Sequence, residues 1–191
     1  MDKKIGGLIK NWAKNNITGL YCDNKQAAAD KILEIIPGSA SIGISGSVTV
    51  EEIGIVKRLE SRGNKVLNQY KPGISREENL QVRRKGIDAD YYLASANAVS
   101  EKGELVFLSA YGNRTAGISY AKNVIVICGI NKLVSDLDSA IKRAKEYAMP
   151  LNYKRLNWDA SQPICCQALI IEAEINPDRL KVILVGENLG F

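Results

Sequence analysis

The run Val124–Cys128 places the strongest constraint on the fold of this 191-residue chain, because every residue in it is apolar and Asn123 and Gly129 bound it. A strand that is apolar at each position has no face for water, so both of its faces must be covered. Such strands occur in parallel sheets that carry helices on both sides. The run therefore predicts an α/β protein with a central, largely parallel sheet.

Strand candidates and amphipathic segments alternate along the rest of the chain. The helical segments repeat apolar residues every three to four positions, as Ala28, Ile32 and Ile35 do. This alternation favours an α/β fold with a mainly parallel sheet and flanking helices. Besides the central run, the strand candidates are residues 17–21, 40–45, 65–70, 91–95, 104–108, 168–173 and 181–185.

The length fits one domain over residues 1–191, since a chain of this size buries roughly 70% of its unfolded surface. Residues 1–23 are predicted to form an N-terminal helix and a short strand. Residues 164–191 are predicted to add a C-terminal strand pair to the same sheet, or alternatively an antiparallel hairpin at its edge. The polar stretch 150–163 is expected to be a surface loop, with a linker as the alternative.

Local signals predict several helix ends. Two Ser/Thr-x-x-Glu patterns, which begin at Thr49 and Ser75, are typical of capping boxes. The helix after the central run is expected to be capped by Ser135 and ended by Pro150. A hairpin is predicted around residues 101–103.

The chain contains no histidine, which excludes Ser–His and Cys–His catalytic pairs and histidine metal sites. Of the four cysteines, Cys128 belongs to the apolar run, and Cys165 and Cys166 are adjacent, a spacing that suits a disulfide framework poorly. The sequence has no apolar leader and no run of 18 apolar residues. We therefore expect a cytoplasmic protein with reduced cysteines and no membrane partner.

The net charge of +5 raises the question of a nucleic-acid partner. The one tight basic run is Arg83, Arg84 and Lys85, and no aromatic residue is interleaved with it. A stacking platform is thus missing from the local sequence. We interpret the run as a solvated helix face and expect no nucleic-acid partner.

Three loops that follow predicted strands carry the candidate site. In an open parallel sheet, ligands bind beyond the carboxyl ends of the strands, where helix N-termini present free amides to anions. The first loop contains Gly46, which would let a ligand approach the backbone; an ordinary strand–helix turn is the alternative. The full set of candidate ligand-binding residues is Ser45, Gly46, Ser47, Thr49, Asn97, Gly112, Asn113, Arg114, Asn131 and Lys132.

Arg114 and Lys132 supply the positive charge of this candidate site, and a guanidinium beside a helix N-terminus suits a carboxylate or phosphate. The alternative for Arg114 is an ion pair with a surface carboxylate. No P-loop or dinucleotide fingerprint occurs in the chain. The loops therefore predict a cleft for a small anionic metabolite, and no metal ion or cofactor is expected.

The same residues lie in strings that resemble the lactate-utilization (LUD) domain family, from about residue 24 to residue 191. The resemblance implies a fold similar to the sugar-phosphate isomerase, CoA-transferase and formyltetrahydrofolate cyclo-ligase group. It also implies a role in L-lactate utilization, often beside iron–sulfur redox partner proteins. The strings are GISGSVTVEEIG, DADYYLASANAVSEKGELV, YGNRTAG, VIVICGINKLVSDLDSAIKRAKEYAMPLNYKRLN and VILVGENLGF.

The chain departs from the family pattern at Ser109, where relatives usually carry an acidic residue, and at Tyr120-Ala121, where Gly-Pro is usual. Its thinned cysteine set argues against an iron–sulfur cluster in this chain. The resemblance thus implies a role in organic-acid utilization, and the candidate loops predict that the protein binds a carboxylate or phosphorylated ligand. The alternatives are a non-catalytic subunit that supports a redox partner and, by fold analogy, a ligase or isomerase. Whether the chain is an enzyme stays open, and a homo-oligomer is compatible with either case.

Overall fold

In the computed structural model, which describes residues 3–159 and 161–191, the central apolar run becomes strand β7 (Val124–Gly129) of a six-stranded sheet. The strand order is β1-β10-β7-β4-β2-β3, and every neighbouring pair is parallel. The predicted α/β class and mainly parallel sheet are confirmed. The other strands are β1 (Thr18–Cys22), β2 (Ser41–Ile44), β3 (Lys65–Leu67), β4 (Tyr91–Ala94) and β10 (Leu180–Val185).

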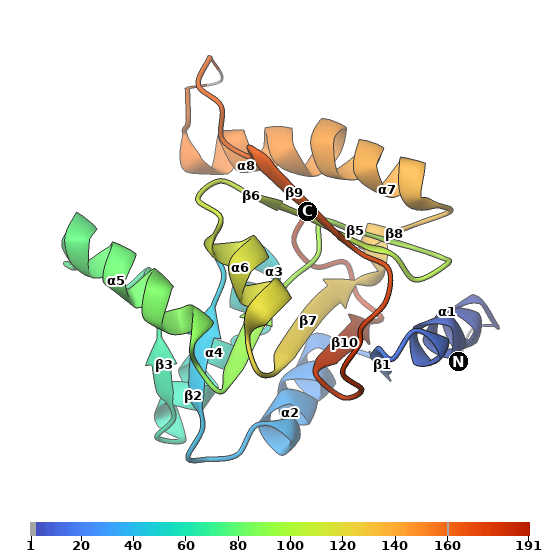
Figure 1. Ribbon diagram of the computed structural model, residues 1–191, viewed down its shortest axis with the longest axis horizontal. Helices are drawn as coiled ribbons and strands as arrows, with labels where there is room; N and C mark the ends of the chain where they lie inside the picture. The colour runs from blue at the N-terminus through green and yellow to red at the C-terminus, as the bar shows by residue number, and fades with distance from the viewer. Residues whose placement is uncertain (1–2, 160) are drawn as a thin grey trace.

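Helices cover both faces of this sheet (Figure 1). One face packs against α2 and the α3–α4 pair, and the other packs against α1, α6 and a second sheet. Side chains of β10 alternate between the two cores: Val182 and Leu184 point to one and Ile183 and Val185 to the other. The helices are α1 (Lys3–Lys14), α2 (Lys25–Ile35), α3 (Val48–Glu52), α4 (Ile55–Ser61), α5 (Arg76–Ile87) and α6 (Asn113–Tyr120).

The second sheet has four strands in the order β8-β5-β6-β9. The predicted hairpin is its centre, since β5 and β6 pair antiparallel across the turn at residues 101–103. A long helix covers its outer face through Ala140 and Ala144. The strands are β5 (Ala98–Ser100), β6 (Leu105–Ser109), β8 (Leu133–Val134) and β9 (Gln167–Ile171).

The C-terminal strands are not the pair that the sequence predicted. Strand β9 joins the small sheet antiparallel to β6, whereas β10 inserts between β1 and β7 in the large sheet. Neither the expected pair on one sheet nor the edge hairpin therefore forms. The reason is that β10 is apolar at nearly every position and needs two covered faces, while the exposed positions of β9 suit an edge.

The long helix also departs from expectation at both ends. Asp136, not Ser135, caps α7 (Leu137–Lys142) by accepting from the Ser139 amide at 2.8 Å. Pro150 does not end the helix, because a π-helical segment, η2 (Arg143–Ala148), leads directly into α8 (Met149–Leu156) with proline in its first turn. Proline lacks an amide hydrogen, but the residues in the first turn of a helix do not need one for the intrahelical hydrogen bonds. The helix therefore continues through Pro150, where a loop was expected.

Two smaller features position the site. The 3-10 helix η1 (Ile130–Lys132) follows β7 and leads to β8. The Ser75 capping box on α5 is confirmed, with the Ser75 hydroxyl accepting from the Glu78 amide and the Glu78 carboxylate accepting from the Ser75 amide. In the described part of the chain, no helix is long and apolar enough to cross a membrane.

Candidate functional site

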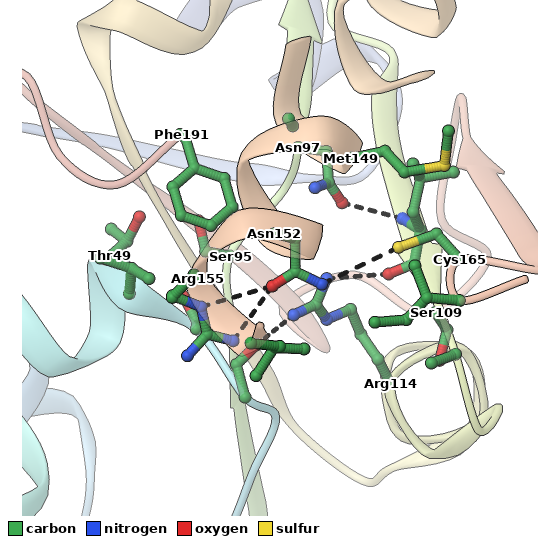
Figure 2. A pocket seen from close by; sticks show the side chains of 18 of the residues that line it. Thr49, Ser95, Asn97, Ser109, Arg114, Met149, Asn152, Arg155, Cys165 and Phe191 are labelled. Atoms are coloured by element: carbon green, nitrogen blue, oxygen red, sulfur yellow. Dashed lines mark hydrogen bonds between the residues drawn. The ribbon is translucent and has the colours of Figure 1, made fainter. Parts of the chain in front are cut away.

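A cavity of about 340 Å³ lies at the carboxyl ends of β2, β4 and β7, between the six-stranded sheet and α8 (Figure 2). Loops after the parallel strands form its floor, as the sequence predicted for a strand-end site. Residues of α6 and of α8 form further walls. Seven of the ten candidate residues line it: Gly46, Ser47, Thr49, Asn97, Asn113, Arg114 and Lys132.

Three candidate residues lie outside the lining and have structural roles. Ser45 is 2% exposed, and both its backbone amide and its hydroxyl donate hydrogen bonds to the Leu93 carbonyl. Asn131 holds the C-terminal segment by accepting from the Leu189 amide and donating to the Gly190 carbonyl. Gly112 adopts a left-handed φ of 80° where the chain turns into α6.

Lys132 is the most deeply placed cation of the cavity, with 3% of the residue exposed. Its Nζ donates to Thr49 Oγ1 at 2.9 Å, to Ser95 Oγ at 2.9 Å and to the Ala96 carbonyl at 3.1 Å. Burial lowers the pKa of this ammonium group from 10.5 to about 8. Three neutral acceptors therefore hold a buried positive charge that no carboxylate pairs with among the described residues.

Arg114 lies in the first turn of α6, and its side chain connects the end of β6 with the loop after β2. Its Nη1 donates to the Leu108 carbonyl at 2.8 Å, and its Nη2 donates to the Gly46 carbonyl. Burial lowers the pKa of the guanidinium, which stays charged at neutral pH. The ion pair with a surface carboxylate, weighed as the alternative, does not form in the described chain.

The first candidate loop differs in detail from its prediction. A Cβ on Gly46 would overlap the Tyr70 hydroxyl, so a side chain of the protein occupies the place that the sequence had offered to a ligand. Ser47, not Thr49, caps α3 by accepting from the Val50 amide at 3.3 Å. The capping box expected at Thr49 is absent, because Thr49 contacts Lys132 and donates to the Leu189 carbonyl at 3.2 Å.

Two asparagines of the candidate set contribute amide groups. The Asn97 Oδ1 accepts from the Leu108 amide at 2.8 Å, and its Nδ2 points away from that contact (Figure 2). The Asn113 Oδ1 accepts from Arg83 Nη1 at 3.0 Å. Asn97 thus keeps a donor for a ligand, while the Asn113 oxygen already has a partner.

Sequence reasoning missed the wall that α8 supplies, because Pro150 was expected to end that helix. Asn152 lies between Arg155 and Arg114 in Figure 2 and accepts from Arg155 Nη2 at 3.0 Å. Its Nδ2 approaches the Cys165 sulfur at 4.0 Å. Burial, partly offset by the charge of Arg114, raises the pKa of this thiol.

Arg83 was also missed, because its aromatic partners are distant in sequence. Its guanidinium lies 6.0 Å from the ring centre of Tyr70 and 5.0 Å from that of Tyr111. The interpretation of the basic run as a solvated helix face is therefore wrong for Arg83 and holds for exposed Arg84 and Lys85.

Positive charge dominates the cavity. Four cationic side chains line it, and none of the described lining residues is acidic. Ser109, which stands where relatives usually carry an acid, lines the wall and accepts from the Gly112 amide at 3.1 Å. The cations are Arg83, Arg114, Lys132 and Arg155. This arrangement can hold a negatively charged ligand through charge-assisted hydrogen bonds.

Comparisons with known proteins place the chain in a family. A DUF162 family protein from Deinococcus radiodurans has a similar structure, with a TM-score of 0.55 and 14% identity over 96% of this chain and 94% of that one. Ribose 5-phosphate isomerase A from Neisseria gonorrhoeae aligns over 59% of this chain and 54% of its own, with 21% identity and a TM-score of 0.38. No curated protein matches the chain. The LUD domain model matches residues 5–185, and the chain therefore belongs to the LUD domain family.

Proposed function

We propose that this LUD-domain protein binds a small carboxylate or phosphorylated metabolite in the strand-end cavity and acts in organic-acid utilization. The observation that carries the proposal is the set of four cations around a cavity of about 340 Å³ with no acidic residue among its described lining. Charges that lack a counter-ion in the protein favour a ligand that brings one.

The contacts within the protein hold these charges in place before a ligand arrives. Two backbone carbonyls orient Arg114, and three acceptors hold Lys132. A guanidinium has five N–H groups, so Arg114 keeps donors beyond the two used by the carbonyls. Such preorganised groups bind an anion at little cost in side-chain entropy.

The wider role follows from the family. LUD-domain proteins are associated with L-lactate utilization, so we assign the metabolite to organic-acid chemistry in the cytoplasm. An iron–sulfur redox protein is the partner proposed for any electron transfer, because histidine is absent from the chain and only Cys165 among the cysteines lines the cavity. A homo-oligomer is compatible with this role.

Isothermal titration with L-lactate and with inorganic phosphate tests anion binding. Arg155→Gln removes a cavity charge that, among the described residues, donates hydrogen bonds only to Asn152, so the fold should persist. We expect the affinity for the bound anion to fall by about 1.5–3 kcal/mol, the range for a charge-assisted hydrogen bond. The matched control is Lys154→Gln, an exposed neighbour outside the lining, which should bind as the wild type does.

Arg114→Ala is a poorer test, because it also frees the Gly46 and Leu108 carbonyls and should destabilise the fold. The proposal is contradicted if the wild type binds neither of these anions nor a larger phosphorylated compound, or if the Arg155 and Lys154 variants lose affinity equally.

A further inference from the structure

Aromatic side chains gather at the mouth of the cavity, where the anion proposal does not use them. Tyr70, Tyr111 and Trp158 all line the cavity, yet their residues are 53%, 64% and 39% exposed. In the described chain the other strongly exposed aromatic residues are Tyr120 and Tyr147. Exposed aromatic groups concentrated at one site commonly mark a binding surface.

Arg83 fixes two of these rings in place. Its guanidinium lies between contacts to Tyr70 and Tyr111, and its Nε donates to Asn79 Oδ1 at 2.7 Å. Its Nη1 donates to Asn113 Oδ1 at 3.0 Å. Three separate segments thus build a platform of rings and guanidinium that lines the same cavity as Arg114 and Lys132.

The cavity is large for a simple organic acid. Pockets of about 300–1,000 Å³ enclose ligands of drug size, and this cavity of about 340 Å³ falls within that range. A three-carbon acid would neutralise one charge and leave the aromatic mouth empty. A ligand that uses the whole site needs more than one negative charge and a planar ring.

We propose that the cavity binds a nucleoside phosphate, with its phosphates at Arg114 and Arg155 and its base against Tyr111 and Trp158. This inference rests on the proposed function, since it names the class of phosphorylated ligand that the same cavity takes. Aromatic side chains stack on every base, because every base has a π face. A cavity of about 340 Å³ beneath the platform has room for a single nucleotide, whereas a nucleic-acid strand would need a groove that follows its backbone.

Tryptophan fluorescence and isothermal titration test the inference with ADP, pyrophosphate, adenosine and a single-stranded oligoadenylate. The chain has two tryptophans, and Trp12 is fully buried and outside the lining, so quenching by a stacked base reports on Trp158. We expect ADP to quench the fluorescence and to bind at least tenfold more tightly than pyrophosphate or adenosine. Tyr111→Leu and Trp158→Leu should each weaken ADP about five- to hundredfold and leave pyrophosphate unchanged.

The control variant is Tyr120→Leu, which removes an exposed tyrosine outside the lining and should leave ADP binding unchanged. Equal affinity for ADP and pyrophosphate would overturn the role of the ring while the anion site stands. Adenosine as tight as ADP would overturn the role of the phosphates, and an oligoadenylate tighter than ADP would place a nucleic-acid strand there instead. If ADP, pyrophosphate, phosphate and lactate all fail to bind, the proposed function fails as well.

Discussion

Lys132 carries a positive charge at a depth where charges are expensive. The side chain is buried, and burial is the main cause that lowers its pKa to about 8. Thr49, Ser95 and the Ala96 carbonyl accept hydrogen bonds from its three N–H groups, but these neutral acceptors do not offset the full cost of removing an ammonium from water. A residue kept at such a cost fits a role in binding.

The pH dependence of stability should reveal this cost. The folded pKa of about 8 lies below the ordinary 10.5, so between these values the unfolded chain holds more protons. The free energy of unfolding therefore rises with pH through that window, and the destabilisation caused by the buried charge reaches its full size below pH 8. The free energy of unfolding of the wild type, relative to Lys132→Met, should increase by about 2 kcal/mol from pH 7 to pH 9.5.

Urea unfolding of both proteins at the two pH values measures the difference, and groups that titrate in both proteins cancel. A difference that stays constant with pH would mean that Lys132 keeps an ordinary pKa in the folded protein.

At the residue level, the sequence predicted most of the residues at the floor of the cavity and missed much of its mouth. Lys132 and Asn97 were found because residues after parallel strands converge at one edge of the sheet. Arg114 reaches the same cavity from the loop after β6, which is an antiparallel strand of the small sheet. Arg83 was missed because Tyr70 and Tyr111 reach it from other segments, and local spacing does not record such contacts.

At the level of elements, two glycines set how closely α5, which carries Arg83, packs on β2. A Cβ on Gly43 would lie 2.7 Å from the Gly86 carbonyl carbon, closer than real Cβ atoms come. A Cβ on Gly86 would lie 3.6 Å from the Gly43 Cα, an ordinary contact. The two positions face each other, yet only one has no room for a side chain.

Gly43→Ala should therefore destabilise the protein by about 1–3 kcal/mol, the usual cost of overpacking, and should move α5 away from the cavity mouth. Gly86→Ala should be neutral or gain up to about 1 kcal/mol, because alanine favours the helix. Thermal and urea unfolding of the two variants check this contrast. Equal effects of both substitutions would contradict the close packing of α5 on β2.

The elements also mark where sequence patterns stop being informative. Apolar periodicity predicted a helix after β7, but the helix-breaking tendency of proline predicted that it ends at Pro150. The sequence analysis therefore did not predict the cavity wall that α8 forms. The π-helical segment η2 places the proline where no amide hydrogen is required. Its Arg143 donates to the Asn97 and Asn131 carbonyls, which joins two strand-end loops.

For the whole molecule, strand patterns predicted the class of fold but not the pairing of the C-terminal strands. The apolar content of β7 correctly required a sheet with two covered faces. Strands β9 and β10 are neighbours in sequence, and nothing local shows that they separate into different sheets. That choice depends on long-range contacts, such as those of β10 with β1 at the opposite end of the chain.

Trp12 connects the two sheets on the far side from α8. It is fully buried, and its Nε1 donates to the Gly103 carbonyl in the β5–β6 turn at 2.9 Å. A Cβ on Gly19 of β1 would lie 2.5 Å from the Trp12 ring, so the indole fits closely over the large sheet. One side chain of α1 thus contacts both sheets.

Trp12→Ala should destabilise the whole protein by about 3–5 kcal/mol, because it leaves a cavity at the junction and removes a buried hydrogen bond. Trp158→Ala is the matched control, since that indole is 39% exposed at the cavity mouth and its loss should change the free energy of unfolding by less than about 0.5 kcal/mol. Urea unfolding followed by circular dichroism measures both variants. If the two sheets form one cooperative unit, the Trp12 variant unfolds in a single transition at lower urea. Equal losses of stability in both variants would show that Trp12 does not couple the sheets.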